Sequence, residues 1–232
     1  MRSTWKRTIM VAALALTLAV SLPGCSIFGT SRGTGSFAGA GGHRLSEGKS
    51  MLLAGDTQGA ARALRKVARG GRSAAAHYYL ALVKRESDPA AALEHVQRSL
   101  SLYPTGQAHL LQGSLLEETD PAGAVRSYRL GLRRADENGP VARLLHRNLG
   151  FALMRREEWK EARSHLEVCA DLAGAGGQRM QDAENAALGL CRYHTGEKQG
   201  AHGAWKLIRD TALREEVLEA AGATDVQLSV LQ

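Results

Sequence analysis

The sequence has few aromatic residues and no run in which β-branched residues alternate with polar ones. Aromatics make up 5% of the 232 residues although 44% are hydrophobic, so alanine and leucine carry most of the apolar content. Those two residues favour helix, whereas strands draw on aromatic and β-branched side chains. The composition therefore predicts an all-α protein with enough apolar residues for a sizeable core.

Motifs that mark catalytic, metal and nucleotide sites are also missing. There is no HExxH pair and no G-x-S-x-G elbow. The stretch "GGHRLSEGKS" looks like a phosphate-binding loop, but His43 stands where that motif needs glycine and no strand precedes it. We expect no metal, no cofactor and no enzymatic activity. We expect exposed or half-packed positions for the histidines, which are His43, His77, His95, His109, His146, His165, His194 and His202.

Three of the seven net positive charges of the chain lie at the N-terminus. Arg2, Lys6 and Arg7 lie in a segment without acids, and the remainder of the chain carries 27 basic and 23 acidic residues. No dense run of Lys and Arg is interleaved with aromatics. A nucleic-acid partner is therefore not expected.

Thr8 to Pro23 contain no charged residue, and this apolar segment is too short for a comfortable transmembrane helix. It follows the cationic start "MRSTWKR", as in a secretory signal. Leu22-Pro23-Gly24-Cys25 then resembles the lipobox of bacterial lipoproteins. The resemblance implies that residues 1–24 are removed and that Cys25 is lipidated, with palmitate among the acyl chains. The alternative is an ordinary signal peptide or uncleaved anchor with an incidental cysteine.

Residues 25–42 would then be a lipidated cysteine followed by a flexible tether rich in Gly and Ser. In the sorting rule usual for such lipoproteins, Asp after the cysteine retains the protein in the inner membrane. Ser26 stands there instead. We therefore expect a lipid anchor in the periplasmic face of the outer membrane.

The rest of the chain repeats itself. "AGDTQGAARALRKVA", "ESDPAAALEHVQRSL" and "ETDPAGAVRSYRLGL" place Asp56, Asp88 and Asp120 at intervals of 32 residues. Two further copies are "REEWKEARSHLEVCA" and "TGEKQGAHGAWKLIR". Asp-Pro in two copies supplies a helix N-cap before proline at the first helical position, so a second helix is predicted to start there.

These copies resemble the tetratricopeptide repeat (TPR), most fully in Leu149-Gly150, Leu153, Ala162, Leu166 and Cys169. The resemblance implies an α-solenoid of about five helix-turn-helix repeats over residues 43–222. Its last segment, 210–222, is expected to be a capping helix, and 223–232 a C-terminal tail. Small residues such as Gly48, Gly150 and Gly189 are expected to let the two helices of a repeat approach closely.

First helices of TPR stacks line a groove that binds peptides or partner helices. Counting family positions onto the sequence gives the inward-facing residues Lys49, Lys84, His109, Arg147, Phe151, Arg155 and Tyr193. The cations would receive an acidic peptide, with Phe151 and Tyr193 as apolar anchors. The alternative is that these residues form the solvated face of ordinary helices.

Cys169 and Cys191 lie on helices that pack together in TPR stacks. In an oxidising periplasm a disulfide could join them. The alternative, which we favour, is two buried thiols that act as small hydrophobic residues.

The combination resembles TPR lipoproteins of the pilotin type, which help the type IV pilus secretin reach and assemble in the outer membrane. The resemblance implies a scaffold whose protein partner is a secretin, and no catalysis. One alternative is an adaptor for cell-wall hydrolases or another envelope complex. Another is an envelope enzyme, which the missing motifs disfavour.

Overall fold

The computed structural model describes residues 40–222. The predicted signal peptide, Cys25, most of the tether and the tail 223–232 lie outside the described residues. Within them the chain forms helices and no strand, and the prediction of an all-α fold is confirmed. The helices are α2 (Ala40–Leu53), α3 (Thr57–Ala68), α4 (Ala74–Lys84), α5 (Pro89–Leu102), α6 (Gly106–Leu116), α7 (Pro121–Leu132), α8 (Pro140–Arg155), α9 (Trp159–Ala175), α10 (Asp182–His194), α11 (Lys198–Lys206) and α12 (Thr211–Ala221).

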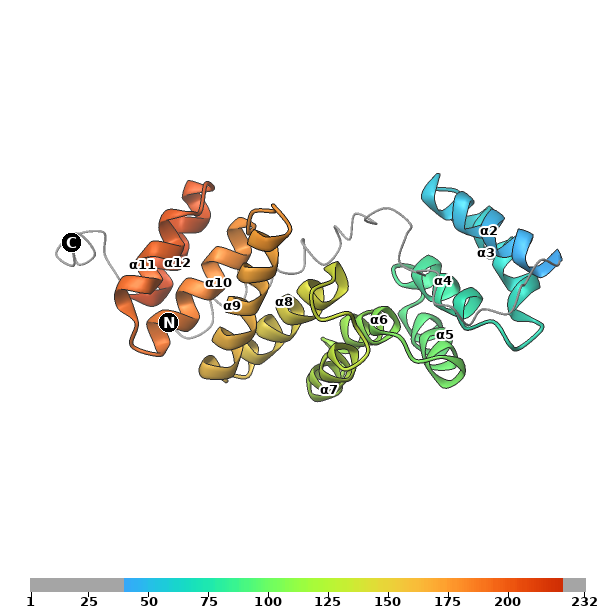
Figure 1. The fold of residues 1–232 in the computed structure, drawn as a ribbon, viewed down its shortest axis with the longest axis horizontal. Coiled ribbons are helices and arrows are strands. Elements are labelled where there is room, and N and C mark those ends of the chain that lie inside the picture. The colour runs from blue at the N-terminus through green and yellow to red at the C-terminus, as the bar shows by residue number, and fades with distance from the viewer. Residues whose placement is uncertain (1–39, 223–232) are drawn as a thin grey trace. The chain divides into compact units, whose positions relative to one another are not determined.

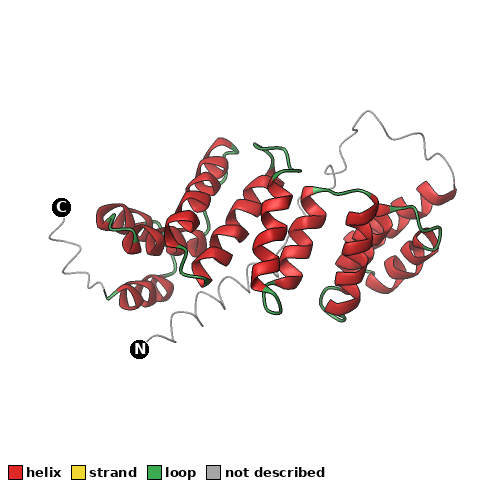
Figure 2. Cartoon of the chain, turned by 90° about the horizontal axis from the view of Figure 1, so that it is seen from below, coloured by secondary structure: helices red, strands yellow, loops and turns green. Residues whose placement is uncertain are grey.

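The described chain divides into two compact units between Arg134 and Ala135. In the first unit α2 pairs with α3, α4 with α5, and α6 with α7 (Figure 1). In the second unit α8 pairs with α9 and α10 with α11, and α12 packs on α10. Within each unit the second helix of one hairpin contacts the first helix of the next. The repeats therefore stack as helical hairpins joined by short loops, as the cartoon also shows (Figure 2).

The second helices of the first three hairpins begin at aspartate caps. The side chains of Asp56, Asp88 and Asp120 accept hydrogen bonds from the backbone N–H three residues on, at 2.7, 3.0 and 2.8 Å. Pro89 and Pro121 follow two of these caps at the first helical position. Because such a cap satisfies an otherwise unpaired backbone donor, each contributes about 1 kcal/mol. The 32-residue spacing read from the sequence is thus the spacing of helix starts.

Glycines allow close approach inside the hairpins, as expected. A Cβ placed on Gly48 would lie 2.7 Å from Leu64 Cγ, and one on Gly150 would lie 2.7 Å from Leu166 Cγ. On Gly189 it would lie 2.1 Å from Trp205 Nε1. Any larger residue at these positions would force the facing side chain of the second helix to shift.

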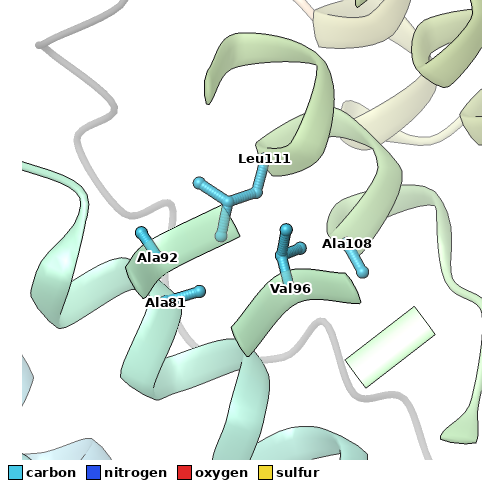
Figure 3. Close-up of a cluster of buried hydrophobic side chains, with 5 residues drawn as sticks. All are labelled: Ala81, Ala92, Val96, Ala108 and Leu111. Atoms are coloured by element: carbon cyan, nitrogen blue, oxygen red, sulfur yellow. The ribbon is translucent and has the colours of Figure 1, made fainter. Parts of the chain in front are cut away.

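The core of the first unit is made of small residues and leucines shared by adjacent hairpins. Figure 3 shows one cluster, to which α4, α5 and α6 contribute Ala81, Ala92, Val96, Ala108 and Leu111. All five are buried. A second cluster joins α3 to α4 through buried apolar side chains. Because each hairpin buries its apolar face only against a neighbour, no hairpin would be stable alone.

The boundaries differ from the sequence expectation at one place: residues 40–42, which we assigned to the tether, belong to α2. Helix α9 extends to Ala175, and the chain then turns at Gly177 with a φ of +65°. The expected capping segment forms α12, which starts at the Asp210 cap and buries Val217 and Leu218.

Candidate functional site: the first-helix faces

The residues predicted to line a groove lie on the first helices of both units. In the first unit α2 contacts α4, and in the second α8 contacts α10. Lys49, Lys84 and His109 belong to the first unit. Arg147, Phe151, Arg155 and Tyr193 belong to the second, three on α8 and one on α10. Two separate faces result, each with its own chemistry.

In the first unit Lys84 is engaged at a hairpin turn. Its Nζ lies 3.1 Å from Asp88 Oδ2, and its side chain is 30% exposed. Asp88 is also the N-cap of α5, and its pKa is lowered by the backbone N–H of Ala91 and then by Lys84. The ammonium group of Lys84 is therefore paired with the carboxylate that caps α5. Lys49 is half-buried on α2.

His109 is the buried member of the first-unit set. It lies on α6 with 9% of its surface exposed, and within the described residues its Nδ1 has no hydrogen-bond partner. Burial lowers the pKa of the imidazole. A neutral ring with a free nitrogen can accept or donate one hydrogen bond. The Nδ1 atom is itself buried, so the ring does not offer this hydrogen bond to a ligand at the surface.

A buried carboxylate organises the face of the second unit. Glu184 on α10 is fully buried, and Arg143 Nη2 lies 3.1 and 2.9 Å from its two oxygens. Arg147 Nη1 lies 3.7 Å from Glu184 Oε1, and its Nε donates to Asn148 Oδ1 at 3.1 Å. The backbone N–H of Gln181 also donates to Glu184. This Arg143–Glu184–Arg147 cluster ties α8 to the start of α10.

The cluster limits the ability of Arg147 to bind an acidic partner. The side chain of Arg147 is only 7% exposed, and an internal carboxylate already meets its charge. The sequence reasoning missed both Arg143 and Glu184. One signal was present: α8 has Arg143, Arg147 and Arg155 but no acid, so a counter-charge had to come from another helix.

The two aromatic residues predicted for this face, Phe151 and Tyr193, differ in how far they are exposed. Phe151 is 4% exposed and belongs to the core. Tyr193 is half-buried, with its ring 5.9 Å from the ring of Trp205 and Lys198 Nζ 6.0 Å from its centroid. Arg155 is half-buried as well. Tyr193 and Arg155 are therefore the predicted side chains in the second unit that are partly exposed.

Cys169 and Cys191 are free thiols in this structure, and both are fully buried. Burial raises the pKa of each to about 12. Because the thiolate is the reactive form, such thiols are inert at neutral pH. They fill space beside the alanines and leucines of the second unit.

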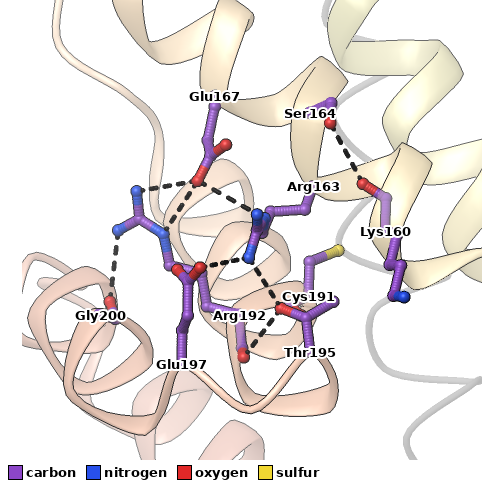
Figure 4. A network of polar contacts seen from close by, with 9 residues as sticks. All are labelled: Lys160, Arg163, Ser164, Glu167, Cys191, Arg192, Thr195, Glu197 and Gly200. Carbon is purple, nitrogen blue, oxygen red and sulfur yellow. Dashed lines mark hydrogen bonds and ion pairs between the residues drawn. The ribbon is translucent and has the colours of Figure 1, made fainter.

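A polar network crosses α9, α10 and α11 on another part of the second unit (Figure 4). Arg163 pairs with Glu197, while Arg192 Nη2 lies 3.3 Å from Glu167 Oε1. Arg192 Nη1 also donates to the carbonyl of Gly200 at 3.3 Å. Most of these groups are partly exposed, so the network positions adjacent hairpins and adds little free energy per pair.

Two kinds of site are not seen in the described part of the chain. Residues 40–222 hold no group of three or more His, Cys, Asp or Glu side chains placed to share a metal ion. None of the helices in the same range combines the length and apolar character that crossing a membrane requires.

Comparison with known proteins identifies the fold. No protein-family model and no curated protein matches the chain. Among solved structures, pilF of Pseudomonas aeruginosa matches with a TM-score of 0.65 and 20% identity, over 82% of this chain and 87% of that one. MamA matches with a TM-score of 0.59 and 17% identity, over 78% of this chain and 93% of that one. Both are TPR proteins, and the chain therefore has the α-solenoid fold of a TPR protein.

Proposed function

We propose that this chain is a periplasmic scaffold, lipid-anchored in the outer membrane, that binds a protein partner and aids assembly of a secretin in the manner of a pilotin. The observation that carries the proposal is the TPR fold, whose first helices offer a face for a peptide or helix. The likeness in fold to pilF supports it. The anchor rests on the sequence around Cys25.

The face of α8 and α10 is the better candidate for partner binding. Helix α8 carries Arg143, Arg147 and Arg155 and no acid, and Glu184 of α10 pairs with the first two of these arginines. Tyr193 adds a half-buried aromatic ring, a residue type that often anchors a partner segment. A partner segment with a carboxylate next to an apolar side chain would match both features.

The test is deletion of the gene in the parent organism, followed by detection of heat-resistant secretin multimers in outer membranes. The proposal expects multimers to be lost on deletion and restored by the wild-type chain. Normal multimers in the deletion strain would show that the pilotin role is wrong.

Two variants test the lipid anchor and the binding face separately. Cys25→Ala removes the acceptor for lipid, so we expect loss of palmitate labelling and of recovery in the outer-membrane fraction. Tyr193→Ala with Arg155→Glu changes the binding face, and we expect normal localisation with few multimers. Exposed Lys160→Glu on α9 is the matched control and should restore multimers fully.

A further inference from the structure

The first hairpin and its surroundings expose a set of cations without acids among them. Between Asp56 and Glu86 the sequence has seven Lys and Arg residues and no Asp or Glu. Five of the seven are exposed, and so is Arg98 on α5. We call these six residues the cationic face: Arg62, Arg65, Lys66, Arg69, Arg72 and Arg98.

Helical spacing places the α3 members on one side. Positions 62, 65, 66 and 69 follow the i, i+3, i+4, i+7 pattern of a single helix face. Ala60, Ala61 and Leu64 lie on the opposite side and are buried. Arg98 extends the surface from α5, because its Nη2 lies 3.5 Å from the carbonyl of Gly71, next to Arg72.

No carboxylate within residues 40–222 forms an ion pair with any member of the cationic face. Glu94, four residues before Arg98 on α5, is the acid nearest in sequence to a member, and the two form no ion pair. Asp56, six residues before Arg62, holds the N-terminus of α3 through Gly59. Three members lie at the C-terminal end of α3, where cations interact favourably with the helix dipole. Arg62, Arg72 and Arg98 have no such role, so helix stability does not account for the whole set.

The excess of positive charge is confined to the first unit. Residues 40–134 contain 14 basic and 8 acidic side chains, whereas residues 135–222 contain 12 basic and 14 acidic ones. The first unit therefore has a net charge of +6 and the second of −2. An exposed surface of one sign attracts a partner of the other sign.

The position of the cationic face in the chain indicates which partner that is. Helix α2 starts at Ala40, fifteen residues after Cys25. Fifteen residues span at most about 50 Å in any conformation, so a lipid on Cys25 would keep the first hairpin near the bilayer. This step rests on the anchor in the proposed function.

We propose that the cationic face binds the phosphate headgroups of anionic phospholipids in the membrane that holds the anchor. Guanidinium groups bind phosphate oxygens in a bidentate manner. Each Lys or Arg near an anionic surface raises affinity about fivefold. The lipid and the cationic face then act as two linked signals, and the face fixes which side of the first unit lies on the membrane.

The test measures sedimentation of the full chain with lipid vesicles. One vesicle is phosphatidylcholine alone, and the other has about a third of its lipid as phosphatidylglycerol, which supplies the anionic surface. The test variant is R62Q/R65Q/R69Q. The control K160Q/R179Q/K206Q removes the same charge from exposed positions of the second unit.

We expect the wild-type chain to favour the anionic vesicles, and R62Q/R65Q/R69Q to lose about tenfold or more of that preference. The control should retain it, and about 1 M salt should abolish it because the screening length falls to about 3 Å. Binding to phosphatidylcholine measures the apolar N-terminal segment and should be equal in all three chains. Circular dichroism confirms that each variant is folded.

Equal preference for anionic vesicles in the test and control variants would overturn the proposal. The proposal would also be overturned if R62Q/R65Q/R69Q lost binding to poly-glutamate but bound vesicles as the wild-type chain does. That result would assign the cationic face to an acidic protein. Either result leaves lipidation of Cys25 untouched. Loss of palmitate labelling in Cys25→Ala reports on the anchor alone.

Discussion

At the scale of single residues, the second unit depends on one buried carboxylate. Glu184 is fully buried, and the side chains of Arg143 and Arg147 beside it are 13% and 7% exposed. A buried ion pair adds little net stability when complete, since desolvation offsets the attraction. Removing one partner is different, because the remaining charges stay buried without compensation. The cluster is therefore sensitive to any change at Glu184.

Glu184→Gln is expected to lower the free energy of unfolding by about 3 kcal/mol, because it leaves two guanidinium groups without a counter-charge. Urea unfolding followed by circular dichroism measures it. Glu197→Gln is the matched control: the side chain of its partner Arg163 is 27% exposed and that of Glu197 is 50% exposed. That change should cost at most about 1 kcal/mol. Similar losses in the two variants would show that the buried cluster has no special role.

At the scale of helices, local signals in the sequence predicted most of the fold. Asp88-Pro89 and Asp120-Pro121 mark helix starts by themselves, and the alanines and glycines of the repeat mark close contacts. The pairing of Arg143 with Glu184 joins residues 41 positions apart. Spacing within one helix could not predict it, because it depends on how α8 packs on α10. The predicted groove residues therefore lie on the expected helices, whereas their burial could not be predicted.

Gly189→Ala tests the close contact between α10 and α11. The added methyl would lie 2.1 Å from Nε1 of Trp205, a side chain that is 1% exposed and has little room to move. We expect a loss of about 2 kcal/mol, since overpacking outweighs the gain in helix propensity. The measurement is thermal or urea unfolding.

Gly203→Ala on α11 is the control for that change. No atom lies within 4 Å of the added methyl, so only helix propensity changes and we expect a gain of about 0.5–1 kcal/mol. If both substitutions stabilise the protein, the contact between Gly189 and Trp205 does not limit the packing of this hairpin.

At the scale of the whole chain, the histidines are less scattered than the sequence suggested. His77 Nδ1 lies 3.2 Å from His95 Nδ1 in the first unit, and His146 Nδ1 lies 2.9 Å from His165 Nδ1 in the second. Each pair joins the first and second helices of one hairpin. Such a contact needs one ring to donate and the other to accept, so the pair cannot form when both rings are charged. Both units thus contain the same acid-sensitive contact.

Stability is therefore expected to fall as the pH drops. Burial, followed by the charge of His165, lowers the pKa of His146 from 6.5 to about 4, and burial also lowers the pKa of His77, His95 and His109. Between these values the unfolded chain binds more protons than the folded one. Stability is then complete above pH 6.5 and decreases as the pH falls toward 4. We expect His146 to account for about 2 kcal/mol of the loss, allowing for its partial exposure.

Urea midpoints at a series of pH values between 7.5 and 4.5 measure the effect. His146→Gln removes the titrating ring from the contact with His165, so its stability should depend less on pH than that of the wild-type chain. His43→Gln, at an exposed position on α2, should follow the wild-type curve. A wild-type stability that is constant down to pH 4.5 would contradict the argument, because it would mean that folded and unfolded chains bind equal numbers of protons over this range.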